Sequence, residues 1–206
     1  MKLPIHALVP FALAATLAAA AAVPSRQPAQ PGGSRADSQR LVEKAARVAA
    51  NGERRAPAAL RTTVTERELN AYLAYDGAEA LPPGVTKPTL VLHGDRRVAG
   101  TAVVDLDAVR AERKPTGMLD PMGYLAGKLP VAASGWLEAR DGVARFQLEA
   151  ASVAGIPIPR MVLQEVVAFY TRSPEYPKGV SLDDPFPLPA AIKAIEVRRG
   201  EAVVVQ

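Results

Sequence analysis

The 206-residue chain contains no cysteine, which excludes disulfides, cysteine-based metal sites and a cysteine-linked lipid anchor. It contains two histidines, and only His93 lies beyond the N-terminal apolar segment, so a histidine-based catalytic triad has a single candidate. The sequence also lacks a glycine-rich phosphate-binding loop, a G-x-G-x-x-G motif and a G-x-S-x-G nucleophile motif. We therefore predict a protein that is not an enzyme and that binds neither a metal nor a cofactor.

Charge of one sign is also scarce, because 25 basic residues accompany 21 acidic ones and the net charge is only +4. The basic residues are scattered among the acidic ones and do not form a cluster, which argues against a nucleic-acid-binding surface. We expect no nucleic-acid partner. A transient contact with an anionic membrane surface is compatible with this mild positive charge.

The only long uncharged run is residues 7–23, which is rich in alanine and ends in small residues at Ala22. A short apolar core followed by small residues is typical of a secretory signal peptide. We predict that residues 1–22 are removed and that the protein is exported to the periplasm or the extracellular space. The alternative is an uncleaved membrane anchor, although this run is interrupted by Pro10 and is short for a bilayer span of about 20 residues.

Beyond the signal peptide, the composition divides the chain into a linker, a peripheral helix and one domain. Residues 23–37 are rich in proline, glycine and serine and lack apolar periodicity, which predicts a flexible linker. Apolar residues at helical spacing predict a weakly hydrophobic, peripheral helix over 38–52. Residues 60–206 are predicted to form a single domain. Near its start, Thr65 and Glu68 have the spacing of a helix-capping box.

The domain contains patterns typical of β-hairpins, one over residues 85–107 and two more toward the C-terminus. Asp141-Gly142 is a preferred two-residue turn. Counting outward from it pairs Glu138 with Arg145, Leu137 with Phe146, Gly135 with Leu148, and Ala133 with Ala150. A last hairpin turns at Arg199-Gly200 and pairs Arg198 with Glu201, Val197 with Ala202, and Ile195 with Val204. We infer that the C-terminal valine run is a strand of the sheet.

Between these hairpins, residues 159–172 form an apolar, helix-compatible segment, with proline at its first turn where the missing N–H has no partner. Hairpins with one long helix packed across them make an α+β fold. The residues beneath this helix are unusually small, including Gly135, Ala133 and Ala150. Such side chains leave either very close packing or an apolar cavity that would suit an acyl chain or a polyprenoid.

Two aspartates are the only pair of acidic residues with a spacing that suggests chemistry. Asp105 and Asp107 lie two residues apart on a predicted strand, so both would project from one face and could seat a divalent cation or act in a hydrolase. The simpler interpretation is that they form the solvent-exposed face of an edge strand.

The segments TERELNAYL (65–73), GIPIP (155–159) and LPAAIKAIEVRRGEAVVV (188–205) resemble those of bacterial envelope proteins of the tubular lipid-binding (TULIP-like) group. The chain is most similar to the small secreted type associated with lipomannan elongation and to its periplasmic lipoprotein relatives. The likeness covers residues 60–206 but is diffuse; the lipobox cysteine is missing and 108–130 does not align. It implies a curved antiparallel sheet of hairpins wrapped around the long C-terminal amphipathic helix, with a hydrophobic groove that holds lipid.

The sequence is therefore compatible with three functions. The first is an exported, non-catalytic protein that binds or shuttles a lipid or polyprenoid. The second is an envelope protein-interaction or scaffold module with a filled core, and the third is a carboxylate-based hydrolase. For the first function, the predicted groove is lined by Leu137, Phe146, Leu148, Val162, Val166, Phe169, Ile195 and Val204.

Overall fold

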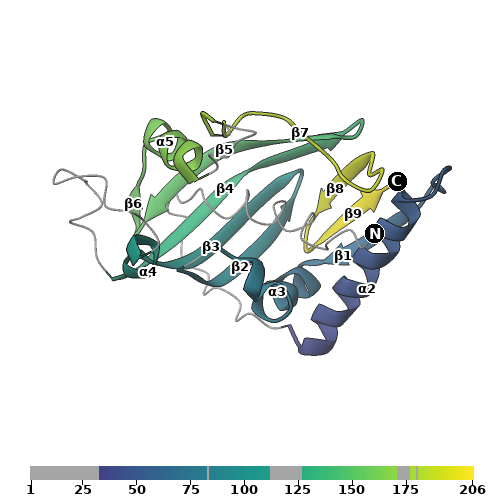
Figure 1. The fold of residues 1–206 in the computed structure, drawn as a ribbon, viewed down its shortest axis with the longest axis horizontal. Coiled ribbons are helices and arrows are strands. Elements are labelled where there is room, and N and C mark those ends of the chain that lie inside the picture. The colour runs from purple at the N-terminus through teal and green to yellow at the C-terminus, as the bar shows by residue number, and fades with distance from the viewer. Residues whose placement is uncertain (1–32, 83, 112–126, 171–176, 180) are drawn as a thin grey trace.

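The computed structural model describes residues 33–82, 84–111, 127–170, 177–179 and 181–206 (Figure 1). The predicted signal peptide and most of the predicted linker lie outside these residues. The elements in chain order are α2 (Arg35–Gly52), β1 (Arg61–Thr65), α3 (Glu66–Ala74), a short 3-10 turn (Ala78–Ala80), β2 (Val85–Gly94), β3 (Arg97–Asp105), α4 (Leu106–Ala111), β4 (Lys128–Arg140), β5 (Val143–Val153), β6 (Ile156–Pro157), α5 (Arg160–Tyr170), β7 (Phe186–Pro187), β8 (Ala194–Arg198) and β9 (Glu201–Val205).

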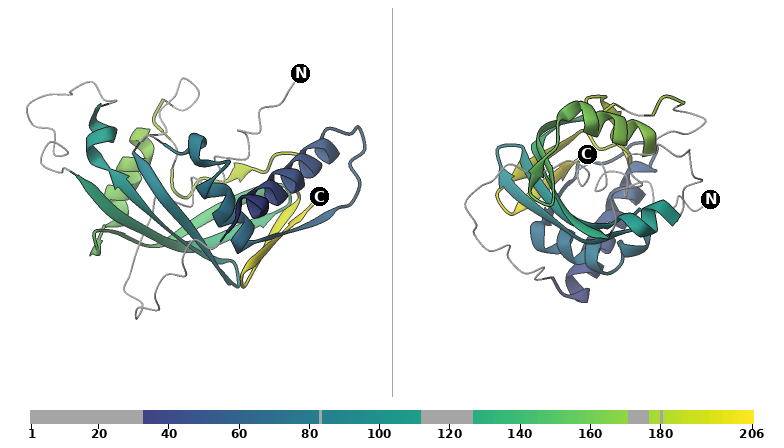
Figure 2. Two further views of the ribbon diagram at one scale, coloured as in Figure 1. Left: turned by 90° about the horizontal axis from the view of Figure 1, so that it is seen from below. Right: turned by 90° about the vertical axis from the view of Figure 1, so that its left-hand side faces the viewer.

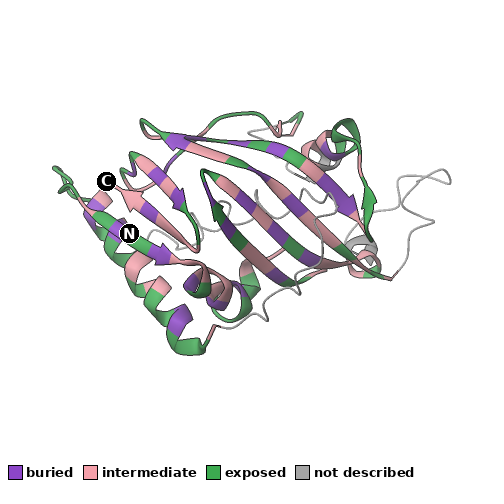
Figure 3. Cartoon of the chain, turned by 180° about the vertical axis from the view of Figure 1, so that it is seen from behind, coloured by how far each residue is buried: buried purple, intermediate pink, exposed green. Residues whose placement is uncertain are grey.

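The strands form two antiparallel sheets. The larger sheet has the order β2-β3-β4-β5-β6, with β7 also pairing with β5, and the smaller sheet has the order β1-β9-β8. Buried and exposed residues alternate along the central strands of the larger sheet (Figure 3), as expected for strands with one face toward a core. The two sheets meet at an angle, and α2 and α3 lie on the inner side of that angle (Figure 2).

Most of the predicted hairpin registers are confirmed. Glu138 pairs with Arg145, Leu137 with Phe146 and Gly135 with Leu148 in the β4–β5 hairpin, and the three predicted pairs of the β8–β9 hairpin also occur. Ala133 pairs with Ala151, whereas Ala150 was predicted. The reason is a bulge next to Gly135 that places one extra residue in β5 and shifts every later pair by one.

The predicted fold class is wrong in its central feature, because the described residues contain no long C-terminal helix with a sheet wrapped around it. The helix α5 has 11 residues and lies against one end of the larger sheet (Figure 1). Its side chain Leu163 is buried, whereas Met161 is 75% exposed and Val162 is 46% exposed. The apolar pattern thus forms a helix, but α5 is short and buries Leu163 while Met161 and Val162 face solvent.

The helices covering the inner angle are α2 and α3, and each begins with a capping box. The Thr65 hydroxyl accepts a hydrogen bond from the backbone N–H of Glu68, as predicted. Ser34 and Asp37 form the equivalent box of α2, so this helix starts at Arg35. Aspartate at the third helical position replaces the glutamate usual in a capping box, so the usual capping-box pattern does not predict a helix start here. The helix was predicted from residue 38 and begins three residues earlier.

Candidate functional site: an apolar cavity beneath α2

The most distinctive internal feature is a partly open apolar cavity of about 200 Å³ between α2, α3 and both sheets. Most of its walls are aliphatic or aromatic side chains, and Lys44 is the only charged residue among the described residues that line it. The lining residues are Leu41, Lys44, Ala45, Val48, Thr62, Val64, Leu69, Tyr72, Leu90, Leu92, Val98, Leu137, Phe146, Phe186, Leu188, Pro189, Ile192, Ile195, Val197, Ala202 and Val204.

One wall of the cavity is a stripe on α2. Leu41, Lys44, Ala45 and Val48 recur at intervals of three and four residues, which places them on one face of the helix. This stripe spans two helical turns, or about 10 Å at 1.5 Å per residue. The remaining walls come from segments that are distant in sequence and that the two sheets bring together.

Four of the eight predicted groove residues line this cavity, namely Leu137, Phe146, Ile195 and Val204. Leu148 does not line the cavity; it belongs to a cluster of buried side chains that also contains Leu163 of α5 and that shares Phe146 with the cavity wall. Val162 is 46% exposed and contributes to neither. Val166 and Phe169 belong to α5, but their side chains lie outside the described part of the structure.

The small residues Gly135 and Ala133 of β4 produce close packing and not a cavity. A Cβ atom at Gly135 would lie 2.3 Å from the carbonyl oxygen of Gln147 and 2.6 Å from the Phe146 ring. Ala133 is 3% exposed and belongs to the same filled cluster. The cavity lies at the other end of the larger sheet, beneath α2, which was predicted to be peripheral. The spacing of Leu41, Ala45 and Val48 was the available signal.

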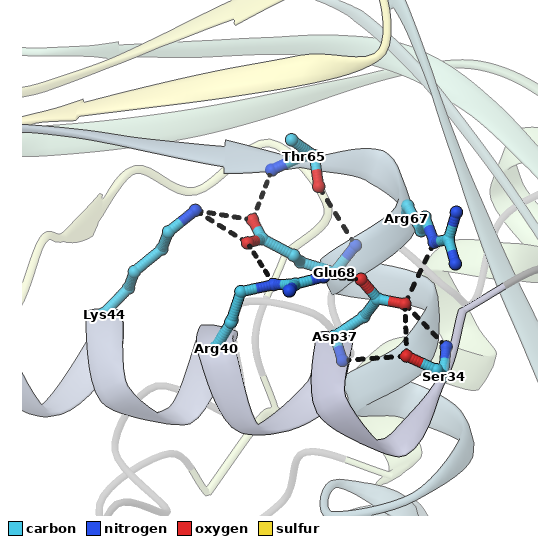
Figure 4. Close-up of polar contacts among 7 residues, drawn as sticks. All are labelled: Ser34, Asp37, Arg40, Lys44, Thr65, Arg67 and Glu68. Carbon is cyan, nitrogen blue, oxygen red and sulfur yellow. Dashed lines mark hydrogen bonds and ion pairs between the residues drawn. The ribbon is translucent and has the colours of Figure 1, made fainter.

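A polar network lies beside the cavity where α2 crosses α3 (Figure 4). The Lys44 ammonium donates to both carboxylate oxygens of Glu68, at 2.8 and 2.7 Å. Glu68 is only 5% exposed and also accepts a hydrogen bond from the backbone N–H of Thr65 at 2.9 Å. Burial by itself would raise the pKa of Glu68, but the hydrogen bonds from Lys44 and Thr65 outweigh burial and lower it.

A second buried carboxylate completes this network. Asp37 accepts hydrogen bonds from the Ser34 hydroxyl and the Ser34 backbone N–H, both at 2.7 Å, and from Arg67 Nε at 2.9 Å. It also pairs with Arg40. The hydrogen bonds from Ser34, followed by those from the two arginines, hold the pKa of Asp37 well below its usual range. Both carboxylates are therefore ionised at neutral pH, and α2 is fixed to α3 by charged hydrogen bonds.

The other end of α2 is fixed by amide groups. Gln206 is 3% exposed, and its Nε2 donates to the backbone carbonyl oxygens of Val48, at 2.9 Å, and Ala190, at 2.5 Å. Its Oε1 accepts from Asn51 Nδ2 at 3.1 Å. Polar contacts thus hold α2 at both ends, while its central stripe faces the cavity.

A larger, open depression of about 450 Å³ lies outside the junction of the two sheets and is lined by Asp95, Arg96, Glu138, Arg140 and Glu196, among others. Glu138 pairs with both arginines of this set, and Glu196 pairs with Arg61 and Arg198. These exposed side chains pair with one another, and the depression is open to solvent and has charged walls. We therefore assign the candidate site to the apolar cavity.

The predicted aspartate pair does not form a metal site. Strand β3 ends at Asp105, and Asp107 lies in α4, so the two do not share a strand face. Asp105 Oδ1 accepts from the backbone N–H groups of Asp107 and Ala108, and Asp107 Oδ2 accepts from Gly127. These carboxylates organise the start of α4. Within the described residues, no group of three potential metal ligands lies close together.

The remaining observations concern relatives and membrane spans. Comparison with protein-family models, curated proteins and solved structures found no match. No helix among the described residues is long and apolar enough to cross a membrane.

Proposed function

We propose that this protein is an exported, non-catalytic carrier that binds an apolar chain, from a lipid or a polyprenoid, in the cavity beneath α2. The observation that supports this most is the lining, in which aliphatic and aromatic side chains from both sheets and two helices surround about 200 Å³. An apolar cavity of about 150 Å³ in another protein stays dry and accepts benzene. The kinship with TULIP-like proteins is proposed on the sequence pattern alone.

Close packing elsewhere in the domain indicates that the cavity is not a general packing defect. Leu163 of α5 lies in a cluster of buried side chains, and Gly135 of β4 has no room for a Cβ atom beside Phe146. Protein interiors are normally packed to crystal-like density, and an unfilled apolar volume lowers stability. A chain that packs closely at these positions and leaves an apolar cavity beneath α2 is best explained by a ligand that fills the cavity.

The test is a matched pair of variants on α2. Ala45 lines the cavity, whereas the neighbouring Ala46 is exposed. Ala45→Phe should place a benzene-sized ring in the cavity and abolish uptake of radiolabelled decyl chains from solution, whereas Ala46→Phe should bind like the parent. Native mass spectrometry of the purified protein should show a bound apolar molecule that the Ala45→Phe variant lacks. Equal uptake by all three proteins would refute the proposal.

A protein-interaction module is the second candidate, and one observation favours it. Ile156 is 66% exposed and Met161 is 75% exposed, near Val162 at the β6–α5 end, so large apolar side chains face solvent there. Exposed apolar patches mark contact sites. A stoichiometric protein partner that is lost with Met161→Ser and Val162→Ser, but retained with Ala45→Phe, would support this function over the carrier.

A further inference from the structure

We infer that the cavity takes a single-chain amphiphile with an anionic head group and that Lys44 holds this head group; the inference rests on the proposed function. The lining is uncharged except for Lys44, among the described residues. An apolar chain in the cavity must therefore place its polar end where the wall is polar. The shared chemistry is a carboxylate or a phosphate at the end of one hydrocarbon chain.

Lys44 lies at the border between the cavity and solvent. It projects from the same face of α2 as Leu41 and Val48, and its side chain is 26% exposed. The aliphatic stem of a lysine packs along apolar surface while its ammonium stays in a polar environment. The position therefore combines contact with a bound chain and access to solvent for the head group.

The Lys44 ammonium retains hydrogen-bonding capacity. An ammonium has three N–H donors, and the contacts of Lys44 use two of them, both to Glu68. Glu68 is fixed independently by the backbone N–H of Thr65, so it orients Lys44 without depending on it for position. The third donor is left for an anion at the edge of the cavity.

The charge balance of the network also favours an anion. Three cations, Arg40, Lys44 and Arg67, surround two carboxylates, Asp37 and Glu68. The cations outnumber the carboxylates by one, so these five side chains together carry one net positive charge. A bound anion would neutralise this charge, whereas a neutral or cationic head group would leave or increase it.

The volume limits the ligand to one chain. A volume of about 200 Å³ exceeds a benzene-sized cavity but falls below the roughly 300–1,000 Å³ of sites that enclose drug-sized ligands. The wall along α2 measures about 10 Å. These dimensions fit a segment of one alkyl or prenyl chain.

The experiment compares four decyl ligands by isothermal titration calorimetry with the exported form of the chain at neutral pH. Decanoate and decyl phosphate should each bind about tenfold more tightly than 1-decanol, the increment of one charge-assisted hydrogen bond. Decylammonium should bind most weakly. A preference between decanoate and decyl phosphate identifies which anionic source the site takes.

Three substitutions localise the effect. Lys44→Met should reduce the affinity for decanoate about tenfold and remove the preference for decanoate over 1-decanol. Lys44→Arg should retain the preference for the anion. Arg47→Met removes a cation from an exposed position of the same helix and should change neither affinity.

The outcomes separate this inference from the proposed function. If 1-decanol or decylammonium binds as tightly as decanoate, the head-group assignment is wrong and the apolar site stands. Should Lys44→Met keep the full preference for decanoate, another group holds the head. If none of the four ligands binds the parent protein, both the inference and the carrier function fail. The four affinities measured with the parent protein test the head-group assignment even where a variant does not fold.

Discussion

At the residue scale, Gly135 shows how one small residue shapes the fold. It lies in β4 beside the bulge, and the Phe146 ring occupies the space that a side chain would need. Because Gly135 has no side chain, the Phe146 ring lies over it and is only 6% exposed. Small residues on the inner face of a sheet can allow either close packing or a cavity. At Gly135 they allow close packing against Phe146.

Gly135→Ala should destabilise the protein by about 1–3 kcal/mol, the usual effect of inserting a methyl group into a filled core. Urea denaturation followed by tryptophan fluorescence would measure it. Ser134→Ala is the control, because it removes only an exposed hydrogen bond to Glu149 and should cost less than about 1 kcal/mol. An unchanged urea midpoint for Gly135→Ala would show that Gln147 and the Phe146 ring move aside without cost.

Glu68 is the second informative residue, since its carboxylate joins α3 to Lys44 of α2. Glu68→Gln should cost about 1–3 kcal/mol at neutral pH, because the charge-assisted hydrogen bonds weaken. The pKa of Glu68 is lower in the folded protein than in the unfolded chain. Such a group stabilises fully above its unfolded pKa, and the stabilisation is lost as the pH falls through its folded pKa.

The stability difference between the parent and Glu68→Gln should accordingly stay constant between about pH 6 and 8 and shrink under acid conditions. Urea titrations at a series of pH values would show this. A difference that grows as the pH falls would contradict the assigned direction of the pKa.

At the element scale, α2 covers the cavity. Its ends are held by the charged network around Asp37 and by Gln206, and its central stripe contacts the cavity. No comparably polar attachment joins the middle of the helix to the sheets among the described contacts. We expect a ligand to enter when the charged hydrogen bonds between α2 and α3 break and the two helices move apart.

The absence of cysteine makes a clean test of this movement available. The Ser38 hydroxyl donates a hydrogen bond to the Asp76 carboxylate, so these side chains meet where α2 passes the end of α3. Ser38→Cys with Asp76→Cys should form one disulfide that slows decanoate uptake at least about tenfold. Stopped-flow mixing would measure the rate.

The reduced form of the same double variant is the control and should bind at the parental rate. Equal rates in the oxidised and reduced forms would show that the ligand enters without displacement of α2.

At the scale of the whole molecule, the two sheets form one cooperative unit. Two hydrophobic clusters, one centred on Phe146 and one on Ile195, both pack against Leu137 and Ala202. Strand β9 lies between β1 and β8, and its backbone pairs with both. Removing β9 would therefore disconnect the smaller sheet and expose both clusters.

Deletion of residues 202–206 should abolish cooperative unfolding, measured as the loss of a sigmoidal thermal transition in near-ultraviolet circular dichroism. Arg199→Ala changes an exposed side chain in the turn of the same hairpin and should stay within about 0.5 kcal/mol of the parent. A deletion variant that melts like the parent would refute the central placement of β9.

Local interactions explain which features were predictable. The Thr65–Glu68 capping box, the Asp141-Gly142 turn and the pairing of Ile195 with Val204 depend on residues close in sequence, and all are confirmed. The shift of Ala133 to Ala151 depends on a bulge, which no alternation of apolar residues indicates. Half of the predicted groove residues line the cavity because hairpin register by itself selects the inner face of a strand.

The sequence by itself determined the hairpins, their turns and most of their registers, because backbone hydrogen bonding and period-two patterning act over short distances. Only the tertiary structure decided which helix covers the apolar face. The cavity joins Leu41, Phe146 and Val204, and its position depends on the angle between two twisted sheets. That angle arises from packing across the whole domain, so the apolar cavity lies beneath α2 and not beneath the more hydrophobic α5.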